Sequence, residues 1–129
     1  MPALMEHRPE FRFYYFTPAY DETVAFYRDV LRFAVYRSWD RESGDRGTIF
    51  VAPNSHGLIE VEAGSQLPSL SGGFYLEVPD VERWYDDVKA AGGLITKELG
   101  DTDYGHRNFK TVDPSGIEVT FFRYVIDPR

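Results

Sequence analysis

The pattern of hydrophobic and polar positions in the first half of the chain predicts one helix among four strands. Residues 11–16 (FRFYYF) form an aromatic run that is typical of a strand. Apolar residues then recur every three or four positions, which predicts a helix with a single apolar stripe. That stripe consists of Tyr20, Val24, Tyr27 and Leu31. Three further strands are expected at about 34–40, 47–52 and 57–62.

The second half predicts the same order of elements. A strand at about 73–78 leads into a helix, and the glycine pair at 92–93 predicts the end of that helix. The apolar stripe of the helix consists of Val81, Trp84, Tyr85 and Val88. Strands are then expected at about 94–98, 105–112 and 116–124.

Two short matches show that the chain repeats itself. Residues 26–30 (FYRDV) resemble residues 84–88 (WYDDV), and residues 59–61 (IEV) recur as residues 117–119 at the same offset of 58 residues. Two matches at one offset indicate two copies of one structural unit. The predicted boundaries are about 10–63 for the first module, 64–72 for a linker and 73–125 for the second module, within a single domain of residues 1–129.

Each module therefore reads as βαβββ, and the predicted fold class is α+β. A sheet of this kind covers one face with its helix and leaves the other face curved and open. Two such units should together form a cup of mixed sheet, and a cup is the natural site for a small ligand.

Composition and charge narrow the range of partners. The net charge is −7, whereas nucleic-acid binding normally needs a basic face, so we expect no nucleic-acid partner. The chain has no Cys, which excludes disulfides, thiolate metal sites and a Cys nucleophile. It shows neither a signal-peptide pattern nor an apolar run of membrane-helix length, so we expect a cytoplasmic protein without membrane contact.

Three segments resemble signatures of the vicinal oxygen chelate superfamily, which includes glyoxalases, bleomycin-resistance proteins and extradiol dioxygenases. Residues 23–33 (TVAFYRDVLRF) are similar to its first-helix signature, although Arg32 stands where the closing Leu-Gly-Phe has Gly. Residues 74–92 are similar to the signature of the second module, and residues 113–116 (DPSG) resemble the late turn before the final strand. Together these segments span nearly the whole chain.

The resemblance also implies where metal-dependent members carry their His, Gln or Glu ligands. Here those three positions are Arg12, Gly73 and Thr120. A guanidinium has no lone pair to donate, glycine has no side chain, and a lone hydroxyl is a poor ligand. Glu60 or Glu62 could match an acid found in some members, but one carboxylate does not make a metal site. We therefore expect no metal and no other cofactor, as in the metal-free bleomycin-resistance-like members.

The three histidines do not restore a metal site. His7 lies near the N-terminus, His56 in a predicted turn and His106 at the start of a predicted strand, and no two have metal-ligand spacing. Each is expected at the surface or in a loop, and His106 is a candidate ligand-binding residue.

Side-chain alternation along the predicted strands assigns residues to the two faces of each sheet. Phe11, Phe13 and Tyr15 are expected to pack on the helices. The candidate ligand-binding residues on the cup side are Arg12, Tyr14, Glu60, Glu62, Tyr75 and Thr120, with Trp39 at the rim or in an interface. Aromatic rings and carboxylates suit a flat or cationic ligand. Pairing of Arg12 with a glutamate would make the cup closer to neutral and open it to polar or anionic ligands.

Two functions remain open. The first is metal-independent binding or sequestration of a small aromatic compound, cationic or not, as in bleomycin-resistance proteins. The alternative is a metal-dependent lyase, dioxygenase or isomerase of the same superfamily with displaced ligands, and a weaker third is a structural or regulatory module without a small ligand. The resemblance implies a homodimer, and the abundance of Tyr and Phe agrees with an apolar interface.

Overall fold

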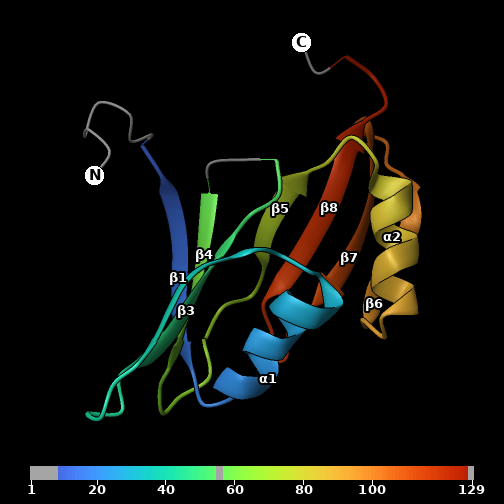
Figure 1. Ribbon diagram of the computed structural model, residues 1–129. Coiled ribbons are helices and arrows are strands. Elements are labelled where there is room, and N and C mark those ends of the chain that lie inside the picture. Colours follow the sequence, from blue (N-terminus) through green and yellow to red (C-terminus); the bar gives the residue numbers. More distant parts are fainter. Residues whose placement is uncertain (1–8, 55–56, 128–129) are drawn as a thin grey trace.

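The computed structural model describes residues 9–54 and 57–127, which form two four-stranded sheets with one helical segment on each (Figure 1). The predicted α+β fold of two βαβββ modules is confirmed. His7 and His56 lie outside the described residues. No helix among the described residues is long and apolar enough to cross a membrane.

The first module contains four strands and one helical segment. Its elements are β1 (Phe11–Thr17), α1 (Tyr20–Ala25), η2 (Phe26–Val30), β2 (Val35–Asp40), β3 (Arg46–Val51) and β4 (Gly57–Ala63). The strands lie in the order β1-β4-β3-β2, with β1 parallel to β4 and the other pairs antiparallel. The strand β1 is therefore an edge of its sheet.

The second module repeats this arrangement. Its elements are β5 (Gly73–Glu77), α2 (Val81–Ala90), β6 (Ile95–Asp101), β7 (His106–Val112) and β8 (Glu118–Tyr124). The order β5-β8-β7-β6 places β5 at the edge, parallel to β8. The two modules thus share one topology, as the repeat in the sequence predicts.

The first helix differs from the prediction in its geometry. It is α-helical as far as Ala25 and then continues as a π-helix through Val30, where the Leu31 N–H donates to the Phe26 carbonyl at 3.0 Å. A π turn is wider than an α turn. In this turn the consecutive aromatic residues Phe26 and Tyr27 are both buried, at 7% and 0% exposure.

The modules join through their helix-covered faces. Phe33 follows η2 and its ring contacts both Trp84 of α2 and Phe121 of β8, at centroid distances of 6.0 and 6.3 Å. Between the sheet edges, the rings of Phe13 and Phe74 lie 5.5 Å apart. One apolar core therefore runs from the first sheet, past α1, to α2 and the second sheet.

A buried carboxylate links the modules at the centre of this core. The Asp113 side chain accepts hydrogen bonds from the hydroxyls of Tyr15 and Tyr27 and from the backbone N–H groups of Ser115 and Ile117. Burial, followed by the nearby Asp113 charge, raises the pKa of Tyr15, so its hydroxyl stays protonated and donates. Four donors offset the cost of burying this carboxylate without a cation.

Candidate functional site

The open face of the first sheet carries one row of residues from all four strands. The strand register places Phe16 beside Glu62, Glu62 beside Gly47, and Gly47 beside Trp39. Paired residues of neighbouring strands project from the same face. The Glu62 carboxylate therefore lies between two aromatic side chains, with a glycine on one side of it.

The glycine in this row makes room for the indole. A Cβ atom at Gly47 would lie only 2.2 Å from Cζ2 of Trp39, so the ring covers the backbone there. The Trp39 Nε1–H donates to Asp45 at 3.0 Å, and the guanidinium groups of Arg37 and Arg41 lie 5.6 and 5.7 Å from its ring centroid. Trp39 is thus held flat on the open face by several independent contacts.

The neighbouring row carries a second glutamate. Tyr14 is paired with Glu60, and the Arg12 guanidinium donates to Glu60 at 2.7 Å and to Glu10 at 2.5 Å. The hydrogen bond to Glu60 is the main cause that raises the pKa of Arg12. Arg12 therefore neutralises Glu60, which makes this face less acidic than its glutamates alone imply.

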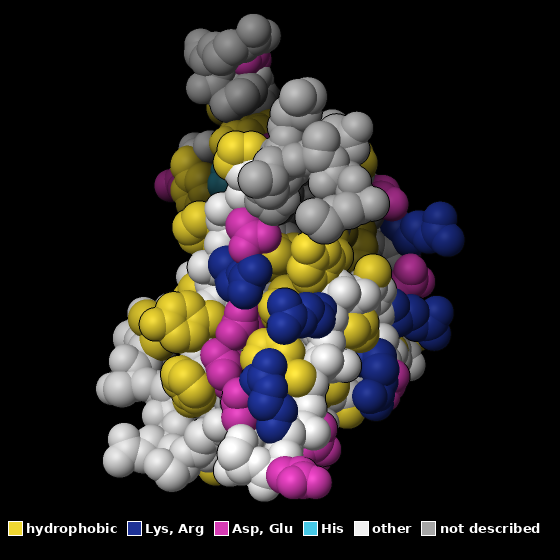
Figure 2. Space-filling model, turned by 60° about the vertical axis from the view of Figure 1, so that its left-hand side comes forward, with side chains coloured by type: hydrophobic (Ala, Val, Ile, Leu, Met, Phe, Trp, Pro, Cys, Tyr) yellow, Lys and Arg dark blue, Asp and Glu magenta, His cyan; other side chains and the backbone are white. Residues whose placement is uncertain are grey.

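Within the described part of the chain, Glu62 has no such cationic partner. Partial burial, followed by the hydrogen bond and charge of Glu60, raises the pKa of Glu62 to about 7. The group can therefore hold or release a proton near neutral pH. Figure 2 shows this side of the molecule, where acidic side chains form a column between hydrophobic side chains and Lys and Arg side chains.

The open face of the second sheet is more aromatic and less acidic. Tyr75 is half exposed, and the Lys110 ammonium lies 4.9 Å from its ring centroid. The same Lys110 Nζ donates to Thr120 at 2.9 Å and to Glu118 at 3.2 Å. Thr120 is therefore a buried partner of a lysine, with 1% of its surface exposed.

His106 lies at the centre of an aromatic cluster on this second face. Its ring stacks on Phe122 at 4.2 Å and contacts Tyr75, Tyr104 and Tyr124 edge-on. Two buried polar atoms on this face lack a hydrogen-bond partner among the described residues. They are Nδ1 of His106 and Oδ1 of Asn108.

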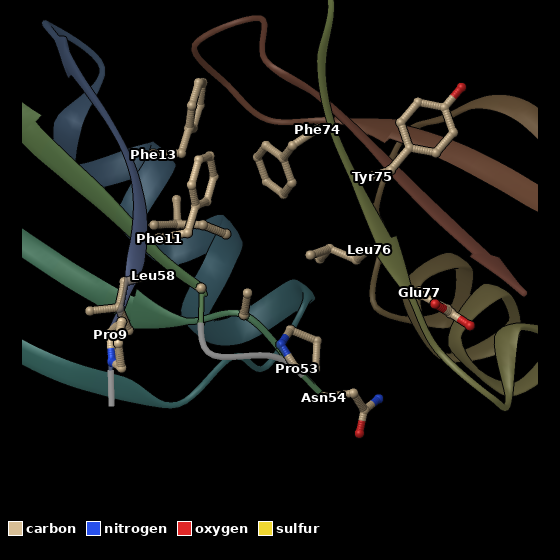
Figure 3. A pocket seen from close by; sticks show the side chains of 13 residues that line it. Pro9, Phe11, Phe13, Pro53, Asn54, Leu58, Phe74, Tyr75, Leu76 and Glu77 are labelled. Carbon is tan, nitrogen blue, oxygen red and sulfur yellow. The ribbon is translucent and has the colours of Figure 1, made fainter. Parts of the chain in front are cut away.

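The candidate residues fall into two groups on different surfaces. The first sheet brings together Arg12, Tyr14, Trp39, Glu60 and Glu62, and the second brings together Tyr75, His106 and Thr120. In Figure 3, Phe13 and Phe74 point toward each other across the space between β1 and β5, whereas Tyr75 and Glu77 point away from it. Because Tyr14 alternates with Phe13, the two open faces look away from each other, and one chain does not bring them together.

The three positions at which the resemblance implies metal ligands do not fit a metal here. Arg12 is committed to two glutamates, and a Cβ atom at Gly73 would lie 1.7 Å from the Glu118 carbonyl oxygen, so no side chain fits there. Thr120 is buried against Lys110. Among residues 9–54 and 57–127, no group of three His, Cys, Asp or Glu side chains could hold a metal ion.

Some residues on the open faces of both sheets were not predicted from the sequence. Asn108 and Lys110 alternate with His106 along one predicted strand, so the period-two pattern could have placed them on the same face. Gly47 could not have been found, because its role depends on the ring of Trp39 from a neighbouring strand. The expectation that Phe11 packs on a helix is wrong, since its side chain is 73% exposed beside β5.

Comparisons with known proteins agree with this fold. The sequence profile of the Glyoxalase/Bleomycin resistance protein/Dioxygenase superfamily matches residues 11–121. A search among curated proteins finds no match.

Solved structures include several similar folds at low sequence identity. TioX from Micromonospora sp. ML1 is 18% identical, with a TM-score of 0.74 over 91% of this chain and 99% of that one. A superfamily member from Alicyclobacillus acidocaldarius is 17% identical, with a TM-score of 0.72 over 92% and 93%. A mutant of the fosfomycin resistance protein FosX from Listeria monocytogenes, in complex with Mn(II) and dihydroxypropylphosphonic acid, is 13% identical, with a TM-score of 0.66 over 90% of each chain. These likenesses concern the fold, and the profile match over most of the sequence shows that the chain belongs to the Glyoxalase/Bleomycin resistance protein/Dioxygenase superfamily.

Proposed function

We propose that the protein binds a small, flat organic compound on the open face of its first sheet, without a metal. The compound would carry a cationic or hydrogen-donating group that meets Glu62. The observation that carries this proposal is the row in which Glu62 lies between Phe16 and Trp39. Aromatic rings on both sides of a carboxylate can stack on a flat ligand while the carboxylate accepts its donor.

The charge of this face sets the ligand chemistry. Glu60 is already paired with Arg12, so Glu62 is the acceptor left for the ligand. Stacking or cation–π contact contributes about 0.5–2 kcal/mol per ring, and a hydrogen bond to a charged group adds roughly 1.5–3 kcal/mol. Two or three such contacts with apolar burial can reach micromolar affinity, about −8 kcal/mol. A metal is not needed for binding of this strength.

The test uses two ligands that share a ring system and differ in charge. Calorimetry compares trimethyl(naphthylmethyl)ammonium with naphthalenesulfonate, on the wild-type protein and on Glu62→Gln. We expect the cation to bind more tightly and to lose at least about tenfold in affinity in the variant, the cost of one charged contact. Glu77→Gln is the matched control, because Glu77 is an exposed glutamate on β5 and outside this row. Preference for the sulfonate, or cation binding that Glu62→Gln does not change, would refute the proposal.

An enzyme of the same superfamily is the second candidate. The position of Glu62 favours it, because partial burial and the neighbouring Glu60 raise the pKa of Glu62 to about 7, which suits a group that transfers protons. A proton-transfer enzyme would show turnover that follows this ionisation and is abolished in Glu62→Gln.

The metal-dependent form of the alternative requires about one zinc, iron, nickel or manganese ion per purified chain, which elemental analysis measures. We expect substoichiometric metal, because Arg12, Gly73 and Thr120 offer no ligand set.

The proposal also includes a homodimer and a cytoplasmic location. The exposed rings of Tyr14 and Phe16 on one open face and Tyr75 on the other support the dimer, since such surfaces favour contact with a partner. The location remains a prediction from the sequence.

A further inference from the structure

A groove lies between the two modules. Its main walls are the faces of β1 and β5 that are opposite to the open faces of the two sheets. It has a volume of about 460 Å³ and runs between the edge strands β1 and β5, with the loop after β3 at one end (Figure 3). Its walls are the side chains of Phe11, Phe13, Phe74 and Leu76, which point into it from the two strands. This volume is within the range of small-molecule sites, about 300–1,000 Å³.

The groove is apolar but has hydrogen-bonding groups along its sides. The strand β1 pairs only with β4 and β5 only with β8, so each presents an edge to the groove. An edge strand carries backbone N–H and C=O groups without a strand partner. Among the described side chains that line the groove, Glu77 is the charged one, and it points away (Figure 3). The surroundings therefore favour an uncharged ligand, because burying an unpaired charge is costly.

The ends of the groove limit the shape of its occupant. The rings of Phe13 and Phe74 approach to 5.5 Å and close one end, and the loop at Pro53 and Asn54 bounds the other. A continuous strand from another chain could not pass between β1 and β5 without displacing these rings. Phe11 is 73% exposed, and its ring stacks on no other ring in the described part of the chain. One aromatic face is therefore available to a flat molecule that enters from solvent.

We propose that this groove is a second ligand site, for a flat, uncharged aromatic molecule with a hydrogen-bonding group at its rim. The ring system of the ligand packs between Phe11 and Phe74, and its rim group bonds to the edge backbone of β1 or β5. This site is independent of the proposed function, because Phe11 and Phe13 alternate along β1 with Tyr14 and Phe16 of the first open face.

The test uses substitutions of groove residues and of one residue of the first open face as reporters of the two sites. The probe is N-phenylnaphthylamine, an uncharged aromatic amine whose fluorescence increases in apolar surroundings. We expect saturable binding of about one probe per chain, weakened about tenfold by Phe11→Ala and by Phe74→Ala. A tenfold loss is about 1.4 kcal/mol, which one aromatic contact together with its buried area can supply. Tyr14→Ala should leave binding unchanged, since Tyr14 projects from the opposite face of β1 and does not line the groove.

The remaining outcomes are also decisive. Phe11 is exposed, so Phe11→Ala should keep the thermal stability of the wild-type protein. If Phe74→Ala unfolds, Phe74→Leu takes its place in the test, because it removes the ring and keeps an apolar side chain. Absence of saturable binding would overturn the proposal. So would binding that is weakened by Tyr14→Ala and not by Phe11→Ala, because the probe would then lie on the first open face. Displacement of the probe by trimethyl(naphthylmethyl)ammonium would likewise show one site instead of two, whereas the Glu62→Gln titrations judge the proposed function separately.

Discussion

Glu62 determines how the charge of the first open face depends on pH. Its neighbour Glu60 is paired with Arg12, and partial burial, followed by the hydrogen bond and charge of Glu60, raises the pKa of Glu62 to about 7. A carboxylate with this pKa changes from mostly protonated to mostly ionised between about pH 6 and pH 8. Ligand affinity and stability should both follow this change.

The first prediction is that cation affinity rises with pH. Binding of trimethyl(naphthylmethyl)ammonium, whose own charge is fixed, should strengthen about tenfold from pH 6 to pH 8, in proportion to the ionised fraction of Glu62. Glu62→Gln should flatten this profile.

The stability of the fold should change with pH in the opposite direction. Because the pKa of Glu62 in the folded state lies above the unfolded value of 4.5, the contribution of Glu62 to the free energy of unfolding is fully present below about pH 4.5. That contribution is lost as pH rises through about 7. In thermal melts, the melting temperature of Glu62→Gln relative to the wild type should therefore be higher at pH 8 than at pH 4.

The second prediction concerns Asp113, which joins the modules. Asp113→Asn replaces an acceptor of two tyrosine hydroxyls with an N–H₂ donor and removes the charge that strengthens all four hydrogen bonds. We expect a loss of about 2–3 kcal/mol in the free energy of unfolding, measured by urea denaturation. Asp103→Asn in an exposed turn is the control and should change stability by less than about 0.5 kcal/mol. Equal effects of the two substitutions would show that the buried carboxylate is not a structural link.

At the scale of the element, the strands follow from the sequence more fully than the first helix does. Alternating side chains place Tyr14 and Glu60 on one face whatever the details of packing, so the faces could be predicted. The change from α to π geometry at Phe26 could not, because it depends on how two adjacent aromatic residues enter a shared core. The role of Gly73 was likewise hidden, since the backbone that crowds it comes from β8.

The end of that helix gives the third prediction. Arg32 has a φ of +59° directly after the helix, in the left-handed region that glycine adopts without strain. Arg32→Gly should relieve about 1–2 kcal/mol of backbone strain and cost about 0.4–1 kcal/mol in the entropy of the unfolded chain. The expected net gain is about 0.5–1 kcal/mol in the free energy of unfolding. Arg28→Gly, where φ is not positive, should instead destabilise by about 1 kcal/mol. A loss of stability in Arg32→Gly would contradict the strain argument.

At the scale of the molecule, the placement of the two sheets relative to each other could not be predicted from local patterns in the sequence. The contacts that set it join residues far apart in sequence, such as Tyr15 with Asp113 and Thr23 with Ser115. These contacts bring the helix-covered faces together and leave the open faces on opposite sides. A cup that contains both Tyr14 and Tyr75 therefore requires two chains.

The fourth prediction is that two chains associate through these open faces. Tyr14, Phe16 and Tyr75 are 61%, 49% and 52% exposed, and a partner that covered such rings would remove substantial apolar area from water. Light scattering at micromolar concentration should give twice the mass of one chain. Phe16→Lys, which adds a charge to the first open face, should shift the protein toward the monomer, whereas Leu94→Lys, at a similarly exposed position between α2 and β6, should not. A monomeric wild-type protein would refute the dimer. It would leave the Glu62 row as a site within one chain, because Phe16, Glu62 and Trp39 all belong to the same sheet.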